Sequence, residues 1–291
     1  MNLTEETFEE VITSPVPILV EAFVPNAPPQ IQEYSDKIKK IVSDYKGVVR
    51  LARLNVQDEP QVAEEFKVTH VPTVMAILQG KLFFNKIVGP STETAVQKYI
   101  LALLSMSFGT EVESILNEAD QLLENNDIEG SAKLFNQLFT SPKYRFAEAF
   151  GYAGLIQCAL KEKNMEAAKH LAETIRNSFP DILNVPRVKQ ALSQVDLSDI
   201  ENNSDFDVNA LLQKVEKDPK DIQSLYDLGL YYHRIGKDED AINYMFKVIK
   251  IDREWNEQAA KKTLIKIFDS LGEDSDIVTK GRKRLNNLWF S

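Results

Sequence analysis

The sequence predicts a mixed α/β domain followed by an all-α domain that forms a helical solenoid. Two observations carry this prediction. Up to about residue 109, short apolar runs rich in β-branched residues alternate with segments of helical periodicity. From residue 110 onward, apolar residues recur only at helical spacing, and similar helix pairs repeat along the chain. We therefore expect two domains, residues 1–109 and residues 110–291, and a chain of 291 residues is long enough to form both.

The first domain is expected to alternate helices with strands. Proline ends the first short helix, because it lacks an N–H donor and its ring clashes with the preceding turn. A turn that contains glycine joins two apolar runs near residue 80, which indicates a β-hairpin. In chain order we expect a short helix before Pro15, a strand at 18–23, a helix from Pro29, a strand at 48–56, a short helix near 58–66, a hairpin with strands at 71–78 and 82–88, and a helix from Ser91.

Three segments of the second domain fit a helix–turn–helix template. Their turns lie at Asn126–Asp127, Lys163–Asn164 and Gly236–Lys237. Small residues stand where the two helices of a pair would cross, and bulky residues stand between them. This pattern resembles the tetratricopeptide repeat, which has a period of about 34 residues and buries its core only by stacking helix pairs.

An acidic stretch, residues 193–207, lies between the second and third helix pairs, and we interpret it as a solvated loop. It lacks the glycine at the turn and the closing glutamate of an EF-hand calcium loop, so it does not predict a metal site. We expect neither a metal nor a cofactor in this protein.

The charge and hydropathy of the chain exclude some partners. With 34 basic and 44 acidic residues, the formal net charge is −10, which repels phosphate backbones and anionic membrane surfaces. The longest apolar run, at 99–106, is too short to span a bilayer. We therefore expect neither nucleic-acid binding nor membrane insertion. The acidic start does not fit a signal or transit peptide, so we expect a bacterial cytoplasmic protein, or a mitochondrial matrix protein if a targeting segment has been removed.

Cys158 is the only cysteine, so no intramolecular disulfide can form. It lies on an apolar helix face, where a single cysteine is usually a packing residue. The alternative is a reactive thiol, with Lys161 as the nearby cation that would favour the thiolate.

Three segments of the first domain carry a family resemblance. The apolar strand at 18–23 leads into a tight loop and then into a helix that opens with proline. Further along lie Thr69-His70-Val71-Pro72-Thr73 and, before the last helix, Gly89-Pro90. Together with the order of elements, these segments resemble a thioredoxin, and the resemblance places the cis-proline of that family at Pro72.

The loop that corresponds to the thioredoxin redox loop lacks the two cysteines. Where a thioredoxin carries Cys-Gly-Pro-Cys, this chain has Ala27, Pro28, Pro29 and Gln30. Neither alanine nor glutamine supplies a sulfur, and thiol–disulfide exchange needs one to attack and one to resolve the mixed disulfide. Glu21 takes the position of a buried acid of the family, and we interpret it as a carboxyl group satisfied by a hydrogen bond.

The last helix combines apolar residues with several cations. Two interpretations of it stay open. The helix can cap the open end of the solenoid, as a terminal repeat must, or it can dock into a groove of a partner protein. The candidate partner-binding residues are Arg284, Leu285, Leu288, Trp289 and Phe290.

A cysteine-poor thioredoxin domain followed by loose tetratricopeptide repeats resembles the YbbN/CnoX-like chaperedoxin family, over almost the whole chain. The resemblance implies a holdase that binds unfolded proteins and associates with the large chaperonin through its C-terminal helix. Some relatives keep one cysteine in the loop and another after the next strand, at the positions of Gln30 and Val56 here, so redox control of clients is not implied for this chain.

The function that we expect is therefore that of a non-catalytic chaperone-type adaptor. One alternative is a structural accessory subunit of a large protein assembly. A thiol oxidoreductase is a further alternative, and the missing sulfurs disfavour it.

Overall fold

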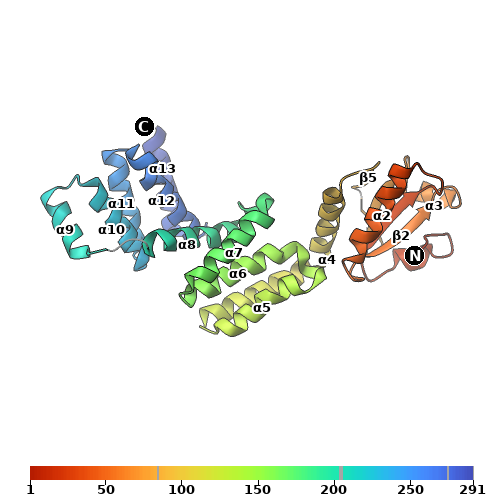
Figure 1. The fold of residues 1–291 in the computed structure, drawn as a ribbon, viewed down its shortest axis with the longest axis horizontal. Coiled ribbons are helices and arrows are strands. Elements are labelled where there is room, and N and C mark those ends of the chain that lie inside the picture. The colour runs from red at the N-terminus through yellow and green to blue at the C-terminus, as the bar shows by residue number, and fades with distance from the viewer. Residues whose placement is uncertain (84, 203–205, 274, 291) are drawn as a thin grey trace. The chain divides into compact units, whose positions relative to one another are not determined.

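The structure, a computed structural model, describes residues 1–83, 85–202, 206–273 and 275–290, without the side chains of Trp289 and Phe290. The chain forms two compact units, residues 1–121 with 133–148 and residues 122–132 with 149–291. Figure 1 shows the fold and labels most of the helices and two of the strands, β2 and β5. The strands are β1 Ile18–Phe23, β2 Arg50–Asn55, β3 Thr73–Leu78, β4 Lys81–Leu82 and β5 Ile87–Val88. The helices are α1 Phe8–Ile12, α2 Pro29–Ser43, α3 Pro60–Glu65, α4 Glu93–Glu124, α5 Ile128–Thr140, α6 Glu148–Lys161, α7 Met165–Ser178, α8 Pro186–Asn202, α9 Val208–Lys217, α10 Ile222–Arg234, α11 Asp238–Ile251, α12 Trp255–Leu271 and α13 Asp276–Phe290, with 3-10 turns η1 Pro142–Ala147 and η2 Pro180–Ile182.

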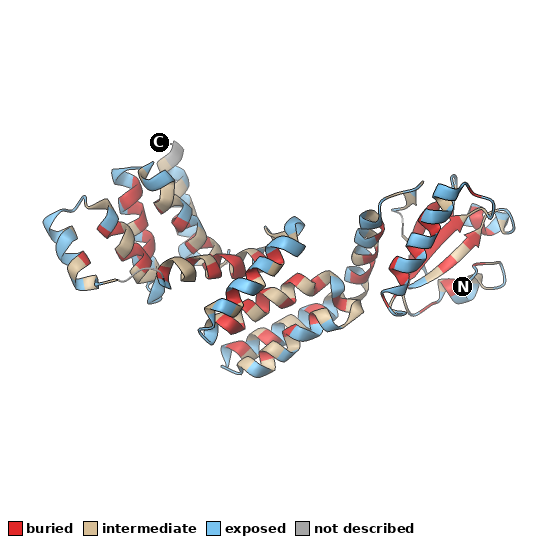
Figure 2. Ribbon diagram, viewed as in Figure 1, coloured by how far each residue is buried: buried red, intermediate tan, exposed pale blue. Residues whose placement is uncertain are grey.

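A mixed sheet forms the centre of the first unit. Its strand order is β2-β1-β3-β4, with β5 also paired to β3. Strand β1 runs parallel to β2 and antiparallel to β3. The central strands are coloured largely as buried in Figure 2, as expected for near-continuous apolar runs. The strand expected at 82–88 forms the short β4 and β5, on either side of residue 84, which is not described.

Side chains of β1 alternate between the two faces of the sheet, because successive strand residues point to opposite sides. Leu19 joins the core formed with α2 and α4, which includes Ile38 and Ile100. Ile18 and Val20 join the core on the opposite face, formed with α1 and α3. Glu21 therefore points to the same face as Leu19, toward α2.

Helix α4 does not end at the domain boundary expected at residues 109 and 110. It continues through Gly109 to Glu124. A glycine inside a helix costs only about 1 kcal/mol relative to alanine, and the helix formers on both sides tolerate it. The first unit also includes residues 133–148, where Lys143 Nζ lies 2.8 Å from the carboxylate of Glu111 on α4. The compact units therefore divide at positions that differ from those expected.

Among the described residues, α4 is the one helix long and apolar enough to cross a membrane by length and composition alone. Its most apolar window has a mean hydropathy of 1.3. A single such helix is weak evidence, because core helices pass the same test. Four of its apolar residues have another role here, since they are buried in the core of the first unit: Val96, Ile100, Leu103 and Leu104.

Helix pairs build the second unit. The pairs α6–α7 and α10–α11 form at the predicted positions, with turn residues Lys163 at φ 59° and Gly236 at φ 74°. Asn164 caps α7 by accepting a hydrogen bond from the Ala167 N–H at 3.1 Å. One core surrounds α6, α7 and α8, and a second surrounds α10, α11 and α12.

The acidic stretch expected as a loop at 193–207 is a helix for most of its length, so that prediction is wrong. Val195 is buried in the core of α6, α7 and α8, and Leu197 is buried in the core of α10, α11 and α12. Asp196 is more exposed and bonds Arg176 at 2.7 Å, whereas the acid Glu201 is buried. In the sequence, the acidic residues masked the helical spacing of the apolar residues. Residue Asp205 lies outside the described residues.

Candidate functional site

The degenerate redox positions lie at one edge of the sheet. Strand β1 ends at Phe23, the loop follows, and α2 begins at Pro29 with Pro28 as its N-cap. Ala22 pairs with Thr73 in the antiparallel register of β1 and β3, so Pro72 precedes β3 at the edge where the loop departs. The Val71–Pro72 peptide bond is cis, the isomer that the resemblance implies.

This loop has few groups for chemistry. Ala27 is buried, whereas Pro28, Pro29 and Gln30 are exposed. The carbonyl oxygen of Ala27 accepts a hydrogen bond from Gln32 Nε2 at 2.8 Å. Proline provides no N–H, and the Pro28 carbonyl already accepts the backbone N–H groups of the residues that follow at the start of α2. The loop therefore presents neither a nucleophile nor a nest of free donors for an anion.

Glu21 is buried beneath this edge, and its carboxylate is fully compensated. Ser35 Oγ donates a hydrogen bond to Glu21 Oε1, and Arg53 Nε donates to Oε2 at 2.9 Å. The guanidinium group of Arg53 also stacks over the Phe23 ring at 3.8 Å. The interpretation of Glu21 as a satisfied buried carboxyl is confirmed. Burial and the Glu21 carboxylate together raise the pKa of Tyr34.

Cys158 is a packing residue by its surroundings. It is buried on α6 with 4% of its surface exposed, and its Sγ atom lies 3.7 Å from Ser131 Oγ. Lys161 Nζ donates a hydrogen bond to the carbonyl oxygen of Leu123. Within the described residues, no group of three or more metal-ligating side chains is found.

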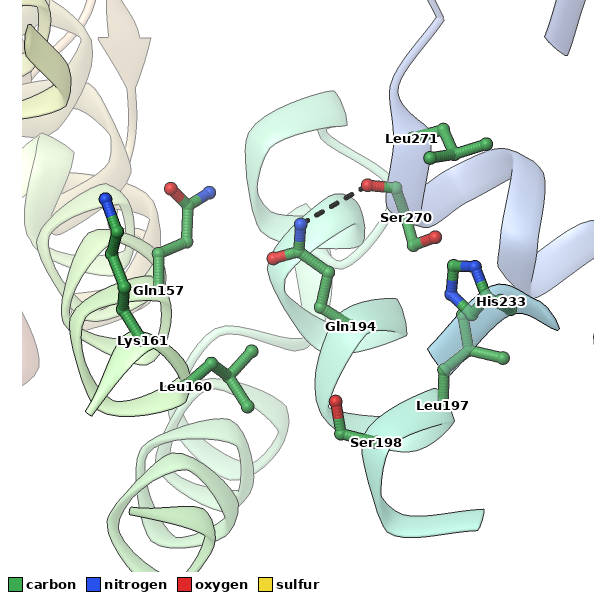
Figure 3. A pocket seen from close by; sticks show the side chains of 9 residues that line it. All are labelled: Gln157, Leu160, Lys161, Gln194, Leu197, Ser198, His233, Ser270 and Leu271. Atoms are coloured by element: carbon green, nitrogen blue, oxygen red, sulfur yellow. Dashed lines mark hydrogen bonds between the residues drawn. The ribbon is translucent and has the colours of Figure 1, made fainter. Parts of the chain in front are cut away.

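The second unit contains a hollow of about 370 Å³ between α6, α8, α10 and α12. Figure 3 shows polar side chains from these helices around it, with Gln194 Nε2 donating to the Ser270 carbonyl oxygen at 3.3 Å. Sequence reasoning missed this hollow, because its residues are far apart in the chain. They are Gln157, Leu160, Lys161, Gln194, Leu197, Ser198, His233, Ser270 and Leu271.

A cluster of titratable side chains from α8, α10 and α11 lies beside this hollow. His233 Nδ1 lies 2.6 Å from Asp238 Oδ1, and His233 Nε2 lies 4.0 Å from Glu201 Oε1. Glu201 is buried, and its Oε1 atom has no hydrogen-bond partner among the described residues. Burial raises the pKa of Glu201 to about 7, although the charges of His233 and Arg234 oppose the shift.

Helix α13 holds the candidate partner-binding residues. Arg284 Nη1 donates to Asn243 Oδ1 at 2.7 Å, and its guanidinium group stacks over Phe246 at 4.0 Å. Leu285 and Leu288 are half-buried and pack against the core of α10, α11 and α12. These contacts are those of a helix that caps the repeat. The side chains of Trp289 and Phe290 lie outside the described residues.

Comparisons with known proteins agree with this architecture. Residues 1–102 match the thioredoxin family, and residues 201–290 match the tetratricopeptide repeat family. Thioredoxin 1 of Nostoc sp. is 29% identical over 98 residues, which cover 33% of this chain and 90% of that protein. The thioredoxin of Griffithsia pacifica is 34% identical over 73 residues, which cover 25% of this chain and 66% of that protein.

A longer similarity is found with an uncharacterised protein of Mycobacterium tuberculosis. It is 27% identical over 151 residues, which cover 47% of this chain and 49% of that protein. The two family matches establish that the chain joins a thioredoxin domain to C-terminal tetratricopeptide repeats. The predicted fold class is thereby confirmed.

Proposed function

We propose that the chain is a non-catalytic adaptor that binds other proteins, a chaperone-type holdase for unfolded clients that also contacts a chaperonin. One observation carries the proposal: Ala27 and Gln30 occupy the two positions where a thioredoxin needs sulfur, beside the retained cis-Pro72. The remaining cysteine, Cys158, is buried in the other unit. A scaffold that keeps its shape without its reactive groups is suited to contact rather than turnover.

The tetratricopeptide repeats support the protein-binding part of the proposal, because such repeats present extended surfaces to partners. The resemblance to chaperedoxins supports the identity of those partners as unfolded proteins and a chaperonin. In this role the protein works in a reducing compartment, the bacterial cytoplasm or a mitochondrial matrix.

Insulin reduction separates this proposal from a thiol oxidoreductase. We expect the wild-type chain to reduce insulin no faster than the reductant alone. A variant with Ala27→Cys, Pro28→Gly and Gln30→Cys restores the missing sulfurs and is expected to gain insulin-reducing activity. This variant is the control that shows whether the scaffold itself can support the reaction. Insulin reduction by the wild type that disappears in Cys158→Ser would show that the chain is an enzyme.

The holdase is tested with chemically denatured luciferase diluted into buffer without reductant. We expect light scattering to fall as the chain approaches a stoichiometric ratio to luciferase. Chaperonin contact is tested with purified chaperonin by size exclusion, and alanine at Leu288, Trp289 and Phe290 is expected to weaken co-elution. If luciferase aggregates equally with and without the chain, the holdase part is wrong.

A further inference from the structure

Helices α11 and α13 both contact α12 and leave a groove between them. The groove consists of two adjoining hollows that share Lys280 and Arg284. The larger, about 570 Å³, has a basic rim formed by Lys250, Lys280, Lys283 and Arg284. The smaller, about 150 Å³, is lined by the apolar residues Ile242, Phe246 and Ile277 together with Glu239, Asn243 and the two shared cations. We call the two together the α11–α13 groove.

The walls of this groove are held closely together. Gly281 of α13 is buried, and a Cβ atom at its position would lie 2.5 Å from the Phe268 ring of α12. The missing side chain lets α13 rest directly on that ring. Arg284 is fixed at the same level by its hydrogen bond to Asn243 and its stacking on Phe246. Arg284 therefore joins the two walls of the groove directly.

The charged residues around the larger hollow are all basic, and the smaller hollow adds one acid, Glu239. Lys250, Lys280 and Lys283 are exposed, and none of them forms an ion pair with a described residue. Many other cations of this unit are paired, as Arg282 is with Asp269 at 2.9 Å. Like charges gathered around one hollow repel one another, and a ligand that carries carboxylates relieves this repulsion. This basic rim contrasts with the chain as a whole, whose formal net charge is −10.

The apolar hollow indicates what else the ligand carries. Ile277 is 37% exposed at its edge, whereas Ile242 and Phe246 beneath it are already buried. A free phosphate would satisfy the lysines but would leave the Ile277 side chain in water. A peptide with a large apolar side chain between acidic residues satisfies both hollows at once. The repeat match at residues 201–290 spans both walls of the groove, which favours a peptide.

We propose that the α11–α13 groove binds an acidic segment of a partner protein, with carboxylates on Lys250, Lys280 and Lys283 and one apolar side chain in the hollow at Ile277. The inference rests on the protein-binding role proposed above and names the chemistry of the partner. The partner's segment enters a groove of this chain.

The experiment measures binding of a fluorescein-labelled peptide, in which four aspartates flank one leucine, to the full-length chain by fluorescence anisotropy. We expect saturable binding that weakens as salt is raised from 0.05 to 0.5 M. The variant with Lys250→Gln, Lys280→Gln and Lys283→Gln loses about tenfold in affinity, since three exposed ion pairs together are worth about that factor. The matched control, Lys214→Gln with Lys217→Gln and Lys220→Gln on exposed positions of the same unit, keeps wild-type affinity.

A second arm tests the apolar hollow. We expect Ile277→Ser and replacement of the peptide leucine by serine each to weaken binding about threefold, and the two changes together to cost no more than one alone. Equal binding of the leucine and serine peptides, together with displacement by inorganic polyphosphate, would assign the groove to phosphates and overturn the proposal. Unchanged peptide affinity in the triple lysine variant would also overturn it.

The luciferase assay on the same proteins separates this inference from the proposed function. If the wild type binds the peptide but fails to hold luciferase, the holdase proposal fails and the groove stands. If it holds luciferase but does not bind the peptide, the groove proposal fails alone. Thermal unfolding of each variant confirms that a loss of binding is not a loss of fold.

Discussion

Glu21 in the sheet and Glu201 on α8 are both buried glutamates, one in each unit, and they differ in the groups that surround them. Glu21 receives hydrogen bonds from Ser35 and Arg53 and pairs with the guanidinium group at 2.9 Å. Glu201 has an Oε1 atom without a hydrogen-bond partner among the described residues, and His233 Nε2 is 4.0 Å from it.

The difference between the two glutamates shows which of them makes the stability of the protein depend on pH. Burying a carboxylate costs several kcal/mol unless a partner compensates it. Arg53 compensates Glu21 directly. Glu201 lacks such a partner, so burial raises its pKa to about 7 and the group becomes protonated near neutral pH. The free energy of unfolding of the helical unit is thus expected to depend on pH. The comparison can be tested by removing the group beside each glutamate in turn.

The largest effect is expected from removing the partner of Glu21. Arg53→Met leaves a buried carboxylate without its cation, and we expect the free energy of unfolding to fall by about 3 to 5 kcal/mol. Urea unfolding at pH 7 measures it. Arg50→Met, on the exposed end of the same strand, is the control and is expected to change stability by less than about 1 kcal/mol.

The double variant Glu21→Gln with Arg53→Met sharpens the test. It removes both charges at once, so most of the lost stability is expected to return. A loss of less than about 1 kcal/mol in Arg53→Met alone would show that solvent, rather than Arg53, compensates Glu21. The contrast with Glu201 would then disappear.

The second effect is the pH dependence at Glu201. Its folded-state pKa of about 7 lies above its ordinary value of 4.5, so the folded state binds more protons between these values. The free energy of unfolding therefore falls as pH rises through this window, by about 2 to 3 kcal/mol. Glu201→Gln removes the ionisable group and is expected to be more stable than wild type by that amount at pH 8.5 and equally stable at pH 4.5.

Glu216→Gln provides the matched control, because Glu216 is exposed on the neighbouring helix α9. Its stability is expected to follow that of the wild type at every pH. The measurement is urea unfolding in a pH series from 4.5 to 8.5. A Glu201→Gln profile parallel to that of the wild type would place the pH dependence on another group.

The first unit could be predicted largely from its sequence, because each of its main elements has a local signal. The apolar run at 18–23 and the periodic segment from Pro29 form β1 and α2 at the predicted positions. The residues predicted to form a degenerate redox loop, 27–30, are neighbours in the chain, so the prediction could be made from the sequence alone. The hydrogen-bond partner expected for Glu21 could be stated only as a class, since Arg53 comes from another strand.

The second unit was less predictable because its sites are assembled from distant helices. The acids of α8 suggested a loop, whereas Val195 and Leu197 are buried in the two cores that α8 joins. The cations of α13 were visible in the sequence, but Lys250 joins them from α11. The charges that surround Glu201, on His233 and Arg234 of α10 and Asp238 of α11, likewise have no local signal, since they come from other helices.

The smallest effect concerns His233, whose positive charge lowers the pKa of Glu201 and so opposes burial. His233→Gln removes this charge while keeping a donor for Asp238, and we expect the pH at which stability falls to move upward by less than one unit. The same pH series of urea unfolding measures the shift. An upward shift establishes that His233 and Glu201 interact across 4.0 Å, as the geometry requires. A downward shift would mean that removing His233 opens the carboxyl group to water, and desolvation would then depend on the imidazole ring rather than on its charge.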